Sequence, residues 1–220
     1  MILDNVEFAE NSEPRCPVIL LVDTSGSMSG ERIRQLNQGI SVFKEETEKD
    51  DIAKMRAEIA IVTFGGSVNL RQDFVTVDDF QPFQLVTEGD TPMGQAIEYA
   101  LNLVENRKET YRSNSIQYYR PWIFLITDGG PTDEWKSAAQ KVHQYESSKK
   151  ITFFAVGVQE ADMDILRQIS PPGRLPVKLQ GLSFTAMFTW LSASMNRVST
   201  GKVGDQQALE PISGWGVVTT

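Results

Sequence analysis

Val18-Ile-Leu-Leu-Val-Asp-Thr-Ser-Gly-Ser-Met-Ser-Gly-Glu31 joins an unbroken apolar run directly to a short polar loop. The run has no polar residue at alternate positions, which is typical of a strand buried on both faces of a parallel sheet. The glycines and serines then end the run, and apolar residues at helical spacing follow from Ile33 to Phe43. This stretch therefore predicts a strand, a turn and a helix, which together form the building unit of an α/β fold.

The same alternation continues along the rest of the chain. Buried strands are expected at 59–64, 122–126 and 151–158, with a weaker one at 177–179, and helical spacing recurs from Met93, Trp135, Met163 and Phe184. Residues 68–74 alternate in polarity and follow two glycines, as an antiparallel edge strand does after a hairpin. We expect an α/β, doubly wound, mostly parallel central sheet with one antiparallel edge strand and helices on both faces.

Length and composition suit one globular domain. The 220 residues are 40% hydrophobic and 23% charged. We expect an N-terminal extension at 1–17, a main domain at 18–200, and a C-terminal arm at 201–220 that lacks both helical and strand periodicity. Trp215 within the arm has two interpretations. It packs back on the domain, which we favour, or it anchors a partner.

The charge and the cysteine content narrow the class of protein. A net charge of -8 disfavours nucleic acid and anionic membrane as partners, because binding to them depends on lysine and arginine. The single cysteine, Cys16, permits no intrachain disulfide, and residues 1–16 carry acidic residues where a secretory signal has a basic start and an apolar run. No apolar run has the length of a membrane span. We therefore expect a cytoplasmic protein.

Polar side chains gather where the predicted strands end. Asp23, Ser25 and Ser27 follow the first strand, Asp128 follows the strand at 122–126, and Thr91 precedes a helix. Ligands of open α/β sheets bind at the carboxyl ends of the strands, and these oxygen ligands suit Mg²⁺, Mn²⁺ or Ca²⁺. A site rich in hydroxyls and poor in carboxylates leaves such an ion under-neutralised, so the ion keeps water or takes an acidic oxygen from outside. The pattern predicts a metal site that binds a Glu or Asp of a protein partner.

The pattern Asp23-x-Ser25-x-Ser27, then Thr91, then Asp128 resembles the metal ion-dependent adhesion site of von Willebrand factor A (vWA) domains. The resemblance covers roughly residues 18–199. It implies that Ser25 and Ser27 ligate the metal through their hydroxyls and that Thr91 does so in at least one state. It also implies that Asp23 and Asp128 contact the metal directly or through water, that Mg²⁺ is the first expectation, and that the protein is a binding module and not an enzyme.

A narrower resemblance lies in residues 18–31, 36–40 and 125–133, which look like the TerY-type vWA proteins. These proteins belong to bacterial tellurite-resistance (tellurium-resistance) and stress-response systems. The resemblance implies a cytoplasmic bacterial scaffold whose partner is a protein kinase or a PP2C-type phosphatase of the same system.

Two other functions remain open at this stage. A metal-assisted hydrolase at the same ion would need a general base, for which Asp90 and Asp133 are the nearby candidates. A scaffold with a vestigial metal site would bind partners unaffected by a chelator. For the binding module, the residues expected to rim the site are Met28, Ser29, Glu31, Asp90, Met93 and Pro131.

Overall fold

The computed structural model describes residues 4–204 and 209–219. Within these residues, one sheet holds seven strands in the order β3-β2-β1-β4-β5-β6-β7. The parallel strands are β1 (Cys16–Asp23), β2 (Ala57–Gly65), β4 (Trp122–Thr127), β5 (Thr152–Gly157) and β6 (Val177–Leu179). The two edges, β3 (Ser67–Thr76) and β7 (Gly216–Val218), pair antiparallel with their neighbours. The predicted mostly parallel α/β sheet is confirmed.

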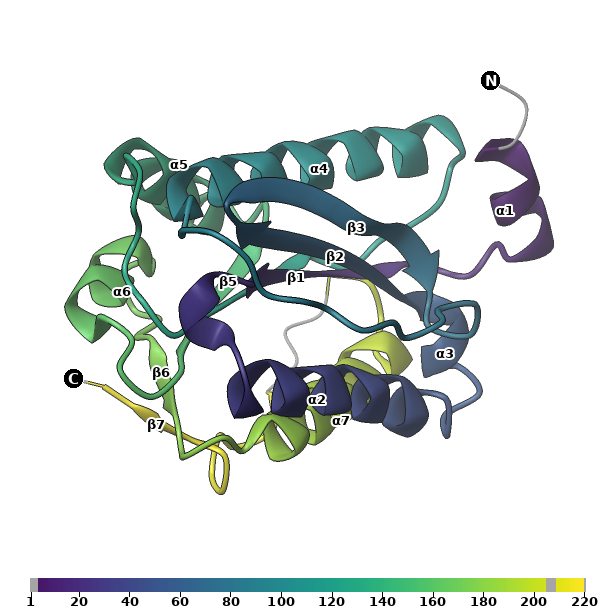
Figure 1. Cartoon of the computed structure of the whole chain (residues 1–220). Coiled ribbons are helices and arrows are strands. Elements are labelled where there is room, and N and C mark those ends of the chain that lie inside the picture. Colours follow the sequence, from purple (N-terminus) through teal and green to yellow (C-terminus); the bar gives the residue numbers. More distant parts are fainter. Residues whose placement is uncertain (1–3, 205–208, 220) are drawn as a thin grey trace.

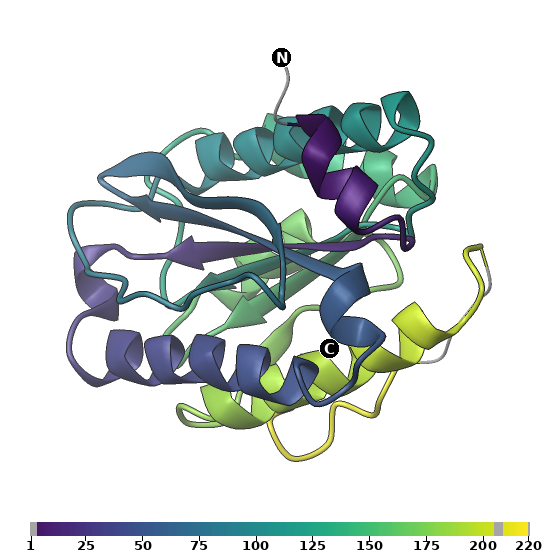
Figure 2. The same cartoon turned by 90° about the vertical axis from the view of Figure 1, so that its right-hand side faces the viewer.

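Helices cover both faces of the sheet, as Figures 1 and 2 show. One face carries α2 (Glu31–Thr47) and α7 (Phe184–Thr200), and the other carries α4 (Met93–Ser113), α5 (Lys136–Ser147) and α6 (Met163–Ile169). Alternate residues of β1 serve the two faces, because successive side chains of a strand point in opposite directions. Val18 and Leu20 belong to the cluster under α2 and α7, while Ile19 and Leu21 belong to the cluster under α4 and α5. The unbroken apolar run of β1 is thus explained by two buried faces.

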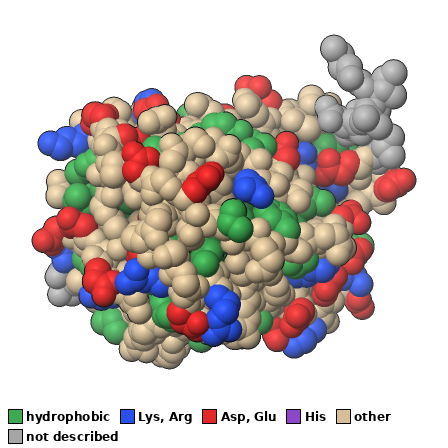
Figure 3. All heavy atoms as spheres, in the orientation of Figure 1, with side chains coloured by type: hydrophobic (Ala, Val, Ile, Leu, Met, Phe, Trp, Pro, Cys, Tyr) green, Lys and Arg blue, Asp and Glu red, His purple; other side chains and the backbone are tan. Residues whose placement is uncertain are grey.

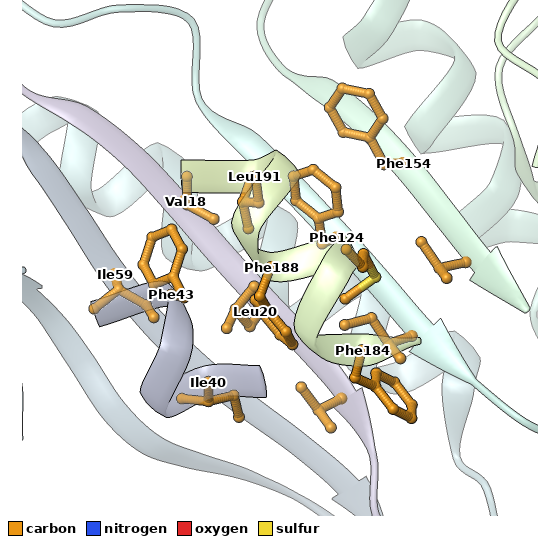
Figure 4. Close-up of a cluster of buried hydrophobic side chains, with 14 of the residues drawn as sticks. Val18, Leu20, Ile40, Phe43, Ile59, Phe124, Phe154, Phe184, Phe188 and Leu191 are labelled. Carbon is orange, nitrogen blue, oxygen red and sulfur yellow. The ribbon is translucent and has the colours of Figure 1, made fainter. Parts of the chain in front are cut away.

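Aromatic side chains fill the core under α2 and α7 (Figure 4). The ring centroids of Phe43 and Phe188 lie 6.3 Å apart, and Phe124 stacks on Phe154 at 4.5 Å. A β-carbon at Gly39 would overlap the Phe188 ring, so the glycine lets α2 approach α7 closely. Burial of each such side chain contributes about 1.5–3 kcal/mol, which makes this layer a major source of stability.

The C-terminal arm adds a second antiparallel edge strand that periodicity did not predict. Trp215 is buried, and its ring centroid lies 5.2 Å from that of Trp190. The Trp215 carbonyl accepts a hydrogen bond from the amide of Gln180 at 2.9 Å, which places β7 beside β6. The interpretation that Trp215 packs back on the domain is confirmed. β7 has only three residues, too few to show an alternating pattern.

Three short helical elements complete the fold: α1 (Asp4–Glu10), α3 (Ala53–Arg56) and the 3₁₀ turn η1 (Gly26–Met28). Ion pairs link α1 to Arg107 of α4, and Arg107 in turn to Glu58 at the amino end of β2. Arg107 contacts Glu7 at 2.5 Å and Glu58 at 2.8 Å, and Glu58 also pairs with Arg15 at 2.8 Å. Arg15 and Glu58 are fully buried, where a charge is tolerated only when it is paired.

On the face in view in Figure 3, acidic and basic side chains are interspersed with small apolar areas. Among the described residues, no helix combines the length and the apolarity required to cross a bilayer.

Candidate metal centre

Four of the five predicted site residues, Asp23, Ser25, Ser27 and Asp128, meet at the carboxyl ends of β1 and β4. These strands are parallel neighbours with Val22 opposite Ile126. Asp23 ends β1, and Asp128 follows Thr127 at the end of β4. The register therefore brings two carboxylates that are far apart in the sequence to the same point of the sheet edge.

Hydrogen bonds link the side-chain oxygens of Ser25, Ser27 and Asp128 into a continuous group. The hydroxyl oxygens of Ser25 and Ser27 lie 3.1 Å apart. Ser27 Oγ donates to Oδ1 of Asp128 at 2.7 Å. Asp128 is buried, whereas Ser27 is exposed, so the group is open to solvent on the side of Ser27.

Asp23 lies beneath these hydroxyls and is fully buried. Its Oδ1 accepts the amide of Ser25 at 2.8 Å, and its Oδ2 accepts the hydroxyl of Thr127 at 2.5 Å. Burial raises the pKa of Asp23 above its ordinary value, the bonds from Ser25 and Thr127 oppose this, and repulsion by Asp128 adds to it. A nearby cation favours the charged form of such a carboxylate.

The loop that carries Thr91 is tied to both neighbouring loops through its backbone. The Thr91 carbonyl accepts the Thr132 amide at 2.9 Å, and the Thr91 amide donates to Thr132 Oγ1 at 3.1 Å. On the other side, the Gly89 carbonyl accepts the Gly26 amide at 3.0 Å. Thr91 thus contributes backbone hydrogen bonds to this assembly, and its side chain is buried. Within the described residues, no hydrogen bond joins that side chain to Ser25, Ser27 or Asp128.

Glycine is required where these loops approach most closely. Gly89 has a φ of +66°, in the left-handed region that glycine adopts readily. A β-carbon at Gly89 would also overlap the backbone of Gly66. The two glycines allow the loop of Thr91 to sit directly against the turn between β2 and β3.

Sequence reasoning missed one charged member of the site, Arg32 at the start of α2. Arg32 Nη1 lies 3.0 Å from Asp128 Oδ2 and donates to the Ser27 carbonyl at 2.7 Å. The same guanidinium donates to Gln159 and Glu160, each at 2.5 Å, in the loop after β5. These partners are distant in the sequence, so no local motif indicated the contact.

Asp133, a candidate general base in the hydrolase hypothesis, is engaged elsewhere. Its Oδ1 accepts the amide of Gly94 and its Oδ2 accepts the amide of Gln95, each at 2.9 Å. Both oxygens therefore cap the amino end of α4, where backbone amides lack helical partners.

The expected rim is only partly correct. Met28 and Met93 are 0% exposed, so the prediction that they face a partner is wrong. Both are core residues of the domain, whereas Ser29, Glu31 and Asp90 are exposed.

The donor set suits a hard divalent cation. It offers two carboxylates, Asp23 and Asp128, and serine hydroxyls within hydrogen-bonding distance of Asp128 and of one another. Oxygen ligands of this type are preferred by Mg²⁺, Mn²⁺ and Ca²⁺. The residues present therefore fit the group that the sequence pattern predicted.

The model of the von Willebrand factor type A domain matches residues 18–186. The chain belongs to this family. A relative, inter-alpha-trypsin inhibitor heavy chain H4 of Sus scrofa, is 28% identical over 123 residues. The match covers 52% of this chain and 12% of the relative, so the chain spans a small part of that protein's length.

Solved structures share the vWA fold. The ArnB paralog VWA2 from Sulfolobus acidocaldarius superposes with a TM-score of 0.57 at 19% identity, covering 83% of this chain and 46% of that one. Proximal thread matrix protein 1 from the mussel byssus, solved with a zinc-occupied MIDAS motif, gives a TM-score of 0.53 at 16% identity, covering 84% and 48%. At these identities the likeness shows the fold.

Proposed function

We propose that this vWA domain is a metal-dependent protein-interaction module. A divalent cation, Mg²⁺ in the first place and Mn²⁺ or Ca²⁺ as alternatives, binds at the carboxyl ends of β1 and β4, and a Glu or Asp of a partner protein binds to it. The residues that would hold the cation are Asp23, Ser25, Ser27, Thr91 and Asp128. The observation that carries the proposal is the chain of contacts from Ser25 through Ser27 to Asp128.

The composition of the site favours binding of an external acid. When bound, the cation supplies a positive centre whose remaining coordination positions accept oxygen ligands. Two carboxylates of the chain bring -2 charge, and Arg32 already neutralises part of it through Asp128. The residual positive character attracts a carboxylate from outside. Ser27 is exposed beside the buried Asp128, which gives a partner side chain access to the site.

Binding is favoured over hydrolysis because one of the two candidate general bases is engaged elsewhere and no contact fixes the carboxylate of the other, Asp90, at the proposed site within the described residues. Asp133 caps α4 with both oxygens. Asp90 is exposed in its loop and its carbonyl accepts the amide of Gly66 at 2.9 Å. Metal-assisted hydrolysis requires a base placed to activate the attacking water. We therefore propose a module without enzymatic activity.

The sequence resemblance supports a more specific role. The segments at 18–31, 36–40 and 125–133 support membership of the TerY-type group, and hence a cytoplasmic scaffold in a bacterial tellurite-resistance or stress-response system. In that setting the acidic partner is a protein kinase or a PP2C-type phosphatase. The mussel protein with a zinc-occupied MIDAS motif supports the general use of this site for metal.

The proposal is tested by measuring how strongly Mn²⁺ accelerates the relaxation of water protons. When Mn²⁺ binds to the protein, this relaxation rate should increase. A Glu-containing peptide that binds to the Mn²⁺ should then lower the rate, because it displaces metal-bound water. Ser27→Ala should weaken Mn²⁺ binding at least about tenfold, as loss of groups that hold a metal commonly does. Ser29→Ala, an exposed serine of the same loop, is the matched control. A peptide that binds equally well with EDTA present would favour the vestigial-site scaffold instead.

A further inference from the structure

A polar cavity lies at the opposite ends of the strands from the proposed metal centre. It has a volume of about 530 Å³ and sits at the amino ends of β4 and β5, beside the carboxyl end of α4. Its basic and aromatic lining residues are Lys108, Arg112, Tyr118, Arg120, Lys149 and Lys150. Pro121 and Val203 add apolar surface to the walls.

The charge of this cavity is opposite to that of the whole chain. The protein carries a net charge of -8, yet the cavity gathers five basic side chains around a single acidic one, Glu105. Glu105 pairs with Lys108 at 2.7 Å, and Glu146 pairs with Arg120 at 3.0 Å. The remaining basic groups are therefore not neutralised by these two carboxylates.

Three basic side chains of the cavity lack an ion pair. Most lysines and arginines of the described residues form one, whereas Arg112, Lys149 and Lys150 in the cavity, and Arg71, Lys136 and Lys178 elsewhere, form none. Lys150 Nζ lies 4.9 Å from the centroid of the Tyr145 ring. Lys202, also without an ion pair within residues 4–204 and 209–219, lines an adjoining cavity of about 480 Å³ that shares Tyr118 and Val203 with the first. Like charges held together without counter-charges cost stability unless an anion binds between them.

Local structure fixes several of these groups in place. Arg112 Nη1 donates to the Tyr118 hydroxyl at 3.3 Å. Arg120 Nε is buried and has no hydrogen-bond partner among the described residues. Lys149 has a φ of +56° because it follows α5 in a left-handed cap, in which the amides of Lys149 and Lys150 donate to the carbonyls of Glu146 at 3.0 Å and Tyr145 at 2.8 Å. This cap fixes where the backbone of the two lysines leaves the helix.

We propose that this cavity binds a phosphate monoester. Its dianion matches the unneutralised charge of Arg112, Lys149 and Lys150, and guanidinium groups bind phosphate through paired hydrogen bonds. The apolar wall would contact the organic part of the ester. The ester belongs either to a phosphorylated side chain of a protein or to a small metabolite such as a nucleoside monophosphate. The site is independent of the metal centre, which lies at the other ends of the strands.

The test is a titration followed by amide chemical shifts, in EDTA and at constant ionic strength. The probes are inorganic phosphate, a phosphoserine peptide with its unphosphorylated counterpart, and AMP. Saturable shifts confined to residues of the cavity are expected with phosphate and with one of the two esters. Tighter binding of the phosphopeptide identifies a protein source, and tighter binding of AMP identifies a metabolite.

Charge-reversed variants decide whether the cavity is responsible. Lys149→Glu with Lys150→Glu should weaken binding at least about tenfold, because two hydrogen bonds to charged groups are lost. Lys136→Glu with Lys178→Glu is the matched control, since it changes the net charge equally at two exposed lysines outside the cavity. Equal weakening in both double variants, absence of saturable binding in the wild type, or equal binding of the unphosphorylated peptide would each overturn the proposal.

Discussion

Arg32 and Asp128 form an ion pair at the proposed metal centre, with Nη1 of the arginine 3.0 Å from Oδ2 of the aspartate. The other carboxylate oxygen of Asp128 accepts the hydroxyl of Ser27 at 2.7 Å. The cationic side chain of Arg32 therefore contacts the same carboxylate that we propose as a metal ligand. A guanidinium and a divalent ion repel each other, so Arg32 should lower the affinity for the metal.

Replacement of Arg32 should therefore strengthen metal binding. For Arg32→Gln we expect an affinity several-fold higher, corresponding to about 1 kcal/mol for a partly exposed charge pair. Arg34→Gln is the control, because Arg34 lies on the same helix and pairs only with Glu31 there. Calorimetric titration with Mg²⁺ measures both. Weaker binding in Arg32→Gln would show that the arginine instead holds Asp128 in position for the metal.

The raised pKa of Asp23 predicts a pH-dependent stability of the metal-free domain. Because burial disfavours the charged form, ionised Asp23 destabilises the fold. This penalty is absent below the ordinary aspartate pKa of about 3.8. It grows as the pH rises from there to the raised pKa of Asp23 in the folded state, and it is complete above that pKa. In EDTA at pH 7, Asp23→Asn should melt at a higher temperature than the wild type, and the difference should vanish near pH 3.5 in thermal scans monitored by circular dichroism. A variant that is less stable throughout would refute this account of Asp23.

Packing between α4 and the loop after β4 should control the position of Thr91. A β-carbon at Gly94 would overlap the carbonyl oxygen of Glu134, whose neighbour Asp133 caps α4. Gly94→Ala should lower the free energy of unfolding by about 1–3 kcal/mol and weaken metal binding as well. A β-carbon at Gly129 would have no other atom within 4 Å, so Gly129→Ala should preserve the stability. Urea unfolding of both variants measures the difference, and equal stabilities would contradict the packing argument.

The buried strands, and the places in the fold of the residues we propose as metal ligands, were predictable because both depend on local sequence. A continuous apolar run such as that of β1 identifies a strand with two buried faces, and Asp23 and Asp128 follow directly from the positions of strand ends. The contact between Arg32 and Asp128 was not predictable, since it joins residues that only the register of β1 and β4 brings together. β7 was missed for a similar reason: its pairing depends on the burial of Trp215 against Trp190, not on its own three residues.

Trp215 should hold the C-terminal arm to the sheet. Trp215→Ala removes a buried ring. It should lower the free energy that holds the arm against the sheet by about 3 kcal/mol. Hydrogen exchange should accelerate in residues 209–219 and remain slow in β1 and β4. Val217→Ala, an exposed position of β7, is the control. Unchanged exchange of the arm in Trp215→Ala would show that other contacts, such as the bond from Trp190 Nε1 to the Glu210 carbonyl at 2.7 Å, are sufficient.

Calorimetric titration of Mg²⁺ into the wild type, Asp128→Asn and Asp164→Asn tests the central claim most directly. Asp164 is an exposed aspartate that pairs with Arg167, so its variant controls for the loss of one negative charge. The account predicts saturable binding of one ion by the wild type and by Asp164→Asn, and a loss of at least about a hundredfold in Asp128→Asn. Equal Mg²⁺ affinity in all three proteins, or no saturable binding by the wild type, would contradict the assignment of a metal centre to these residues.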